Sequence, residues 1–156
     1  MNLYANSMAK PASPPFEKEQ IASHWQRARF AQQPFFRGFN PQQTSLLTAS
    51  AMEMKFEAGE MIYAEGSPAN RFYLILEGEV VLESEMPDRS AIPVQTLGPG
   101  EDLGWSWLFP PYSFHLSARA TAPTKTMFFH GNRLREHCAQ DHELGRKMMN
   151  LCALWE

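Results

Sequence analysis

The first candidates for chemistry in this chain are its five histidines, because histidine is a common metal ligand. A metal site needs several such ligands on one face. Only two of them lie close together, and a separation of five residues on a helix places those two on different faces. No His-X-His pair with a following carboxylate occurs. The sequence therefore predicts no metal site. The histidines are His24, His115, His130, His137 and His142.

Catalytic motifs of the nucleophilic and nucleotide-handling kinds are missing as well. No Gly-X-Ser-X-Gly run exists for an activated serine, and neither a phosphate-binding P-loop nor a dinucleotide fingerprint is present. The crowded carboxylates from Glu77 to Glu85 fall on one expected strand and its turn, where a solvated face is the default. We therefore predict a protein that is not an enzyme.

The most unusual segment is an aromatic insert at residues 105–112, which reads Trp-Ser-Trp-Leu-Phe-Pro-Pro-Tyr. Two interpretations are open: a structural plug or docking surface, or an aromatic lining for a flat or apolar ligand. Pro110 and Pro111 have no backbone N–H, so they remove two donors that a phosphate cradle would use. The insert thus disfavours an anion site.

Before the strands, the sequence pattern is helical. Residues 1–15, rich in Ser, Ala and Pro, are expected to form a mobile tail. Over 17–33, Ile21 and Trp25 fall at about helical spacing, and Pro34 stops the helix. The sequence predicts one helix over this range.

A second helix is predicted over 41–51. Asn40 is suited to cap it, and Pro41 is suited to its first position. Leu46 and Leu47 are expected to point inward.

Between residues 52 and 130 the pattern changes to short apolar runs separated by glycines at intervals of about ten residues. This is typical of an antiparallel sandwich or barrel, because turns that need positive φ select glycine. The predicted strands are 53–56, 61–64, 72–77, 80–85, 92–97, 115–120 and 124–129.

Residues 131–156 are predicted to be helical again, with an apolar seam formed by Leu144, Met148, Leu151 and Trp155. Two interpretations of this seam stay open: it packs on its own barrel, or it pairs with a second copy. The two cysteines, Cys138 and Cys152, are expected to be reduced packing residues, with an interchain disulfide or a reactive thiol as the alternative.

Composition limits the partners. In 156 residues, 14 Lys and Arg stand against 17 Asp and Glu, a net charge of -3 that lacks the basic field used to bind nucleic acid. No apolar run is long enough for a signal peptide or a membrane span. We expect one soluble, cytoplasmic domain that contacts neither nucleic acid nor membrane directly.

Four glycine-containing runs carry a family resemblance: Phe-Glu-Ala-Gly-Glu at 56–60, Glu-Gly-Ser-Pro-Ala at 65–69, Phe-Tyr-Leu-Ile-Leu-Glu-Gly-Glu-Val at 72–80 and Leu-Gly-Pro-Gly-Glu-Asp-Leu-Gly at 97–104. Over roughly residues 35–156 the chain resembles the cyclic-nucleotide-binding domain of Crp/Fnr-type regulators. The resemblance implies a mainly β fold, an eight-stranded jelly-roll (cupin-like) barrel with flanking N- and C-terminal helices and a ligand held by a phosphate-binding cassette.

The cassette departs from the family at its anchors. In the family it opens Phe-Gly-Glu, whose Glu accepts a ribose hydroxyl, and an Arg near its close binds the phosphate. The resemblance puts Trp105 at the Glu, Phe114 at the Arg and His115 at the adjacent phosphate contact. Because loss of one partner of a buried charge pair costs about 3–5 kcal/mol, we expect no cAMP binding of the usual kind.

The candidate ligand pocket follows from this alignment. Arg119 lies five residues after Phe114 on an alternating strand, so it is expected to point to the opposite face. The pocket residues are Gly104, Trp105, Ser106, Trp107, Ser113, Phe114 and His115.

Three functional hypotheses remain. The first is a non-catalytic regulatory module that acts through contacts with another protein or a second copy of itself. The second is a sensor of a small ligand, either a cyclic nucleotide or an apolar molecule, that signals through the C-terminal helix, and the third is an accessory subunit of a larger assembly. No cofactor is required by the residues, and a cyclic nucleotide is the one candidate. Because the chain ends at Glu156, no helix-turn-helix domain is expected.

Overall fold

The structure, a computed structural model, describes residues 19–21 and 23–153. The mobile tail predicted for residues 1–15 and the seam residue Trp155 lie outside the described residues. In chain order the elements are β1 (Glu19–Ile21), α3 (His24–Phe30), the 3-10 helix η1 (Pro34–Gly38), α4 (Pro41–Ala49), β2 (Met52–Phe56), β3 (Met61–Tyr63), β4 (Arg71–Glu77), β5 (Val80–Glu85), β6 (Ala91–Leu97), β7 (Asp102–Leu103), the 3-10 helix η2 (Trp105–Leu108), β8 (Ser117–Ala120), β9 (Thr124–His130), α5 (Gly131–Gln140) and α6 (His142–Ala153).

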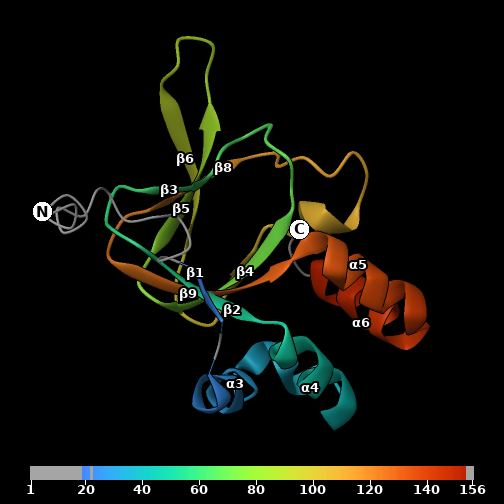
Figure 1. Cartoon of the computed structure of the whole chain (residues 1–156). Helices are drawn as coiled ribbons and strands as arrows, with labels where there is room; N and C mark the ends of the chain where they lie inside the picture. Colours follow the sequence, from blue (N-terminus) through green and yellow to red (C-terminus); the bar gives the residue numbers. More distant parts are fainter. Residues whose placement is uncertain (1–18, 22, 154–156) are drawn as a thin grey trace, which may run out of the picture.

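Two antiparallel sheets form the barrel (Figure 1). One has the strand order β1-β2-β9-β4-β7, and the other has the order β3-β8-β5-β6. The eight strands β2 to β9 give the mainly β jelly-roll that the resemblance implied. Strand β7 was not predicted from the sequence, because two residues are too few to show an alternating pattern.

The helix predicted over 17–33 is wrong at both ends. Residues 19–21 are a strand whose Glu19 pairs with Met54 of β2, and helix α3 spans only His24–Phe30. A reciprocal cap starts this helix: the Gln26 N–H donates to Ser23 Oγ at 3.1 Å, and the Ser23 N–H donates to Gln26 Oε1 at 2.7 Å. The Ser-X-X-Gln signature of such a cap is present at residues 23–26, but the prediction of a helix from residue 17 did not use it.

Helix α4 spans Pro41–Ala49, with Asn40 as its cap and Pro41 at its first position. Leu46, which was expected to point inward, is instead 41% exposed, and Trp25 of α3 is 78% exposed. Leu47, by contrast, is fully buried.

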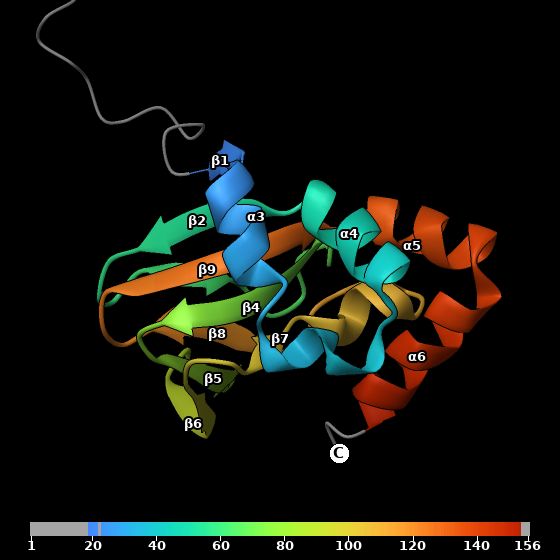
Figure 2. The same ribbon diagram turned by 90° about the horizontal axis from the view of Figure 1, so that it is seen from below.

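Strand β4 divides the core in two. Phe72 and Leu74 contact a cluster that includes the helices, whereas Tyr73 and Ile75 contact the barrel interior. Successive strand residues point to opposite faces, so a strand covered on both sides reads as one continuous apolar run. Figure 2 shows the helices gathered against one side of the sheet that contains β4.

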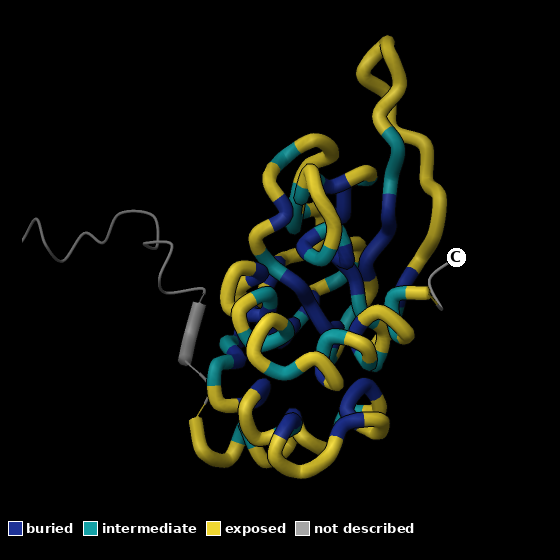
Figure 3. The backbone as a smooth tube through the Cα atoms, turned by 90° about the vertical axis from the view of Figure 1, so that its right-hand side faces the viewer, coloured by how far each residue is buried: buried dark blue, intermediate teal, exposed yellow. Residues whose placement is uncertain are grey.

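The hairpin of β5 and β6 projects beyond the barrel, and residues 91–96 along β6 are all exposed (Figure 3). None of the helices in the described part of the chain has the length and apolar character that a membrane span requires.

Candidate functional site

The cassette loop, residues 104–116, begins at a glycine that cannot be replaced without strain. Gly104 has φ of 95°, and a Cβ at this position would stand 3.0 Å from the carbonyl oxygen of Arg71. The loop therefore passes directly over the start of β4.

The side chain of Trp105 is fixed by contacts of its own and does not act as an acceptor for a ribose hydroxyl. Its Nε1–H donates to Asp102 Oδ1 at 2.7 Å, and its ring lies 4.5 Å from the ring of Phe72 between centroids. An indole has a donor and no acceptor, so it cannot take the hydrogen bond that the family's Glu accepts.

Phe114 stacks face to face on Tyr63, with ring centroids 3.6 Å apart and planes inclined by 10°. Burial raises the pKa of Tyr63 well above its ordinary value, and the neighbouring Tyr73 raises it further. These rings give the position of the family's phosphate anchor an apolar surface that disfavours charge.

The backbone donors near the close of the loop are also occupied. The N–H of Phe114 donates to the Ser67 carbonyl at 3.0 Å, and the N–H of Tyr112 donates to the Phe109 carbonyl at 2.9 Å. With these amides paired inside the protein and two prolines immediately before Tyr112, this end of the loop has few donors left for an anion.

The cavity that remains at the cassette has a volume of about 190 Å³. Five of the predicted site residues line it, whereas Trp107 is fully buried in the helical side of the core and Ser113 pairs with Pro68 in an isolated bridge. Sequence reasoning missed Tyr63, Leu82 and Leu116, which are ordinary strand or loop residues with no distinguishing pattern. The lining residues are Tyr63, Leu82, Gly104, Trp105, Ser106, Phe114, His115 and Leu116.

Arg119, which was expected to point away from the ligand pocket, lies apart from this cavity. Its Nε lies 3.3 Å from Glu83 Oε1, and its Nη1 donates to the Gly59 carbonyl at 2.9 Å. Among the described residues, no three His, Cys, Asp or Glu side chains come close enough to hold a metal ion.

Larger hollows lie elsewhere on the surface. One of about 790 Å³ lies on the outer side of the five-stranded sheet, between Lys55 of β2 and Lys125 of β9, and carboxylates line it as well.

Helix α5 packs directly on the cassette. Arg135 Nη1 donates to the Trp107 carbonyl at 2.8 Å, and its guanidinium lies 4.4 Å from the ring centre of Tyr112. A Cβ on Gly131 would stand 3.0 Å from Trp107 Cβ, so the helix start is as close as a glycine allows.

The seam residues of α6 pack within their own chain. Leu144 and Met148 are buried to 0% and 1% exposure in the core cluster shared with the other helices, and Leu151 packs against its edge. Leu144 and Met148 are therefore covered within the chain, whereas Leu151 is half-buried. Burial also raises the pKa of the Cys138 thiol to about 11, which disfavours the reactive-thiol alternative for this cysteine.

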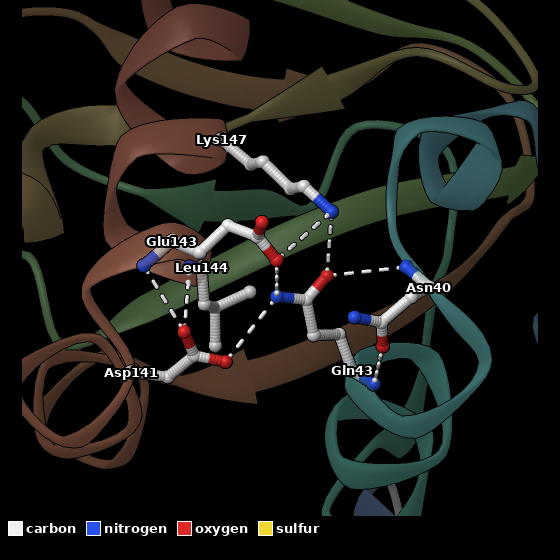
Figure 4. Close-up of polar contacts among 6 residues, drawn as sticks. All are labelled: Asn40, Gln43, Asp141, Glu143, Leu144 and Lys147. Carbon is white, nitrogen blue, oxygen red and sulfur yellow. Dashed lines mark hydrogen bonds and ion pairs between the residues drawn. The ribbon is translucent and has the colours of Figure 1, made fainter.

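A polar cluster of Gln43, Asp141, Glu143 and Lys147 joins α4 to α6 (Figure 4). Gln43 Nε2 donates to Asp141 Oδ2 at 3.2 Å and to Glu143 Oε1 at 3.1 Å, and its Oε1 accepts from Lys147 Nζ at 2.8 Å and from the Asn40 N–H at 3.1 Å. Both ends of this buried amide are thus fully paired.

Fold and cassette together define a mainly β jelly-roll domain with flanking helices and a cassette loop packed against its barrel. The sequence profile of the cyclic nucleotide-binding domain family matches residues 53–141. Because that match spans more than half of the chain, the chain belongs to this family.

Several solved structures and curated sequences are similar to the chain. A cyclic nucleotide-binding protein from Geobacter metallireducens is 32% identical, with a TM-score of 0.73 over 82% of this chain and 92% of that one. The sensor domain of a transcriptional regulator from Pseudomonas aeruginosa shares the fold, with a TM-score of 0.72 at 17% identity over 85% of this chain and 91% of that one.

Among curated proteins, a CRP-like cAMP-activated global transcriptional regulator from Mycobacterium tuberculosis is 25% identical over 118 residues, 76% of this chain and 53% of that protein. The chain spans about half the length of the curated relatives it matches. These relatives are regulators and sensor domains, which is consistent with a regulatory module.

Proposed function

We propose that this chain is a regulatory module whose cassette does not hold a cyclic nucleotide in the family's manner and which acts through contacts with another protein. The observation that carries the proposal is the stacked pair of Phe114 and Tyr63 at the place of the phosphate anchor. A cyclic phosphate placed there would lose its hydration against two aromatic faces and gain no cation in return.

Cavity size supports the same conclusion. Pockets for drug-sized ligands measure about 300–1,000 Å³. The cassette cavity, at about 190 Å³, is below this range. A nucleotide would have to displace Phe114 or Trp105, and both are buried and packed.

A second candidate function, sensing of a small neutral ligand, is favoured by the polar groups that edge the same cavity. Ser106 and His115 lie beside the aromatic pair, so the cavity offers hydrogen bonds without a fixed charge. A flat, uncharged molecule much smaller than a nucleotide fits this chemistry.

Thermal unfolding with and without 1 mM cAMP or cGMP tests the proposal. A site with a dissociation constant of about 10 µM would add about 2.7 kcal/mol at that concentration, which raises the Tm of a domain of this size by roughly 5–10 °C. We expect no shift. A rise that depends on dose, and that is lost when Ser106 is replaced by a bulky residue, would show that the cassette binds nucleotides.

A further inference from the structure

Charge is distributed very unevenly along this chain. Residues 20–52, which contain α3, η1 and α4, hold three arginines and no Asp or Glu. Residues 53–130, which form the barrel, hold eleven carboxylates against five Lys and Arg. A net charge of about +3 on one layer therefore adjoins about -6 on the other, so the helical layer is electrostatically suited to an acidic partner.

The same layer has a groove between α3 and α4, with a volume of about 630 Å³. The two helices lie side by side on the side of the sheet away from the β5–β6 hairpin (Figures 1 and 2). Buried phenylalanines Phe36 and Phe39 line the groove together with small side chains of α4. Helix α3 lines it with His24, Arg27 and Ala28, and the residue after the helix, Ala31, continues this face, at positions i, i+3, i+4 and i+7.

Two large apolar side chains of the same two helices are exposed, although neither lines the groove itself. Trp25 precedes the groove residue Ala28 by one turn and is 78% exposed, while Leu46 precedes Ala49 by one turn and is 41% exposed. Such exposure of a tryptophan is unusual, because this residue is highly buried on average. Tryptophan and arginine are also the residues that most often dominate binding energy at protein interfaces.

We propose that this α3/α4 groove binds an acidic amphipathic helix of another protein. Apolar residues of that helix, spaced at i, i+3 or i+4, occupy the groove and extend over the exposed ring of Trp25 on α3. Its carboxylates face Arg27, which lines the groove, and Arg29, which follows on the same helix. This inference rests on the proposed function, since it names the surface and the kind of partner through which the module acts.

Charge argues for this occupant over others. The chain's own residues 1–18 contain Lys10, Lys18 and a single carboxylate, Glu17, so they do not complement a basic groove. Nucleic acid would meet three arginines on the helical layer but a strongly acidic barrel next to it. An anionic membrane meets the same repulsion, and one exposed tryptophan gives little buried area for insertion.

The test is a selection of 16-residue peptides from a displayed random library on the folded chain, with a parallel selection on Trp25→Ala. Peptides retained by the wild type and lost on the variant should carry several Asp or Glu and apolar residues at helical spacing. For a synthetic peptide of the leading sequence, we expect Trp25→Ala to weaken binding roughly 30- to 100-fold, as for an interface anchor.

Charge reversal gives the second measurement. Arg27→Glu with Arg29→Glu should slow association of the same peptide at least tenfold and reduce its salt dependence. Two matched controls lie outside the groove: Val94→Ala, at a position 55% exposed on β6, and Arg133→Glu, exposed on α5. Each control should change the affinity less than twofold.

Several outcomes would overturn the inference. They are enrichment of neutral or basic peptides, retention of the same peptides by Trp25→Ala, or Trp25-dependent binding to duplex DNA or to vesicles of phosphatidylserine and phosphatidylcholine. Self-association abolished by Trp25→Ala would identify a second copy instead. Peptides that bind elsewhere on the chain would contradict the groove as the binding surface but not the proposed function. A Tm that rises with cAMP would contradict the proposed function but not the peptide result.

Discussion

The cassette and the α3/α4 groove are opposites. At the cassette, a loop that the fold uses to surround a ligand is filled by rings, with Phe114 6% exposed and Trp107 fully buried. At the groove, Phe36 and Phe39 line an open hollow of about 630 Å³, and Trp25 on the adjoining helix α3 is 78% exposed. The aromatic side chains of this protein therefore close one concavity and border another.

This contrast shows that family membership and binding surface are separate properties of a chain. The barrel needs the turn glycines and the apolar runs, and both are present. A phosphate site needs an arginine or free amides as well, and the stacked pair and the paired loop backbone take their place. An exposed basic layer needs neither the features of the barrel nor those of a phosphate site. It is formed by surface side chains that do not pack in the barrel.

The largest effect is expected from emptying the filled cassette. Phe114→Ala should destabilise the fold by about 3–5 kcal/mol, because it removes a buried ring and leaves a cavity against Tyr63. Phe109→Ala, in the same loop but 44% exposed, is the matched control and should stay within about 0.5 kcal/mol. Urea unfolding measures both. Equal losses for the two variants would mean that Phe114 does not fill the site.

The two buried tryptophans of the cassette give a smaller and sharper comparison. Replacement by Phe removes a similar volume from each, but only Trp105 donates a hydrogen bond to a carboxylate, whereas Trp107 Nε1 is buried without a partner. Trp105→Phe should therefore lose about 1.5–3 kcal/mol more than Trp107→Phe. The difference between their urea midpoints at equal slope checks this. A greater loss for Trp107→Phe would indicate that its N–H is satisfied in solution, for example by an ordered water.

Between the two regions lies the polar cluster of α4 and α6. Gln43→Ala should cost about 1–3 kcal/mol, because Asp141, Glu143 and Lys147 lose a fully paired and buried amide. Gln42→Ala, one residue earlier and exposed, should change stability by less than about 0.5 kcal/mol. Chemical denaturation followed by far-UV circular dichroism compares the two. If the two variants have the same stability, the cluster does not hold α6 against α4.

Much of the barrel could be predicted from the sequence, because its strands follow glycine turns whose φ is positive at Gly59, Gly66 and Gly78. The seven predicted strands all occur, shifted by two residues at most. The exposed Trp25 and Leu46 could not be predicted, since helical periodicity does not say which side of a short helix meets the core. That choice is made by tertiary contacts such as the burial of Phe30 and Leu47.

The candidate site was predictable in composition and less so in arrangement. Alignment to the family identified Trp105 and Phe114 as replacements, but not the direction in which each ring points. The stacking partner Tyr63 belongs to a strand about fifty residues earlier, and the acceptor Asp102 comes from β7, which the pattern did not reveal. The stacked pair of Tyr63 and Phe114 leaves no local signal, because its rings come from distant segments. By contrast, the bond from Trp105 to Asp102 is local and depends on how the loop turns after β7.

The smallest expected effect is a pH dependence of the cluster that joins the helices. Asp141 accepts hydrogen bonds from the backbone N–H of Leu144 at 3.1 Å, from Gln43 at 3.2 Å and from the N–H of Glu143 at 3.0 Å. These bonds, with the Leu144 amide foremost, hold the pKa of its carboxyl below the ordinary value of 3.8. The ionised group is therefore favoured in the folded protein relative to the unfolded chain.

The sign follows from that depressed pKa. Ionised Asp141 stabilises the fold at pH above about 3.8, and this contribution is lost as the pH falls from there through the lower pKa of the folded state. Asp141→Asn should therefore lose less stability between pH 7 and pH 3 than the wild type does, as measured by the urea midpoint at each pH. Glu136→Gln, an exposed carboxylate of α5 outside the cluster, should leave the wild-type acid dependence in place. An acid dependence of Asp141→Asn equal to that of the wild type would mean that the contact between α4 and α6 does not depend on this charge.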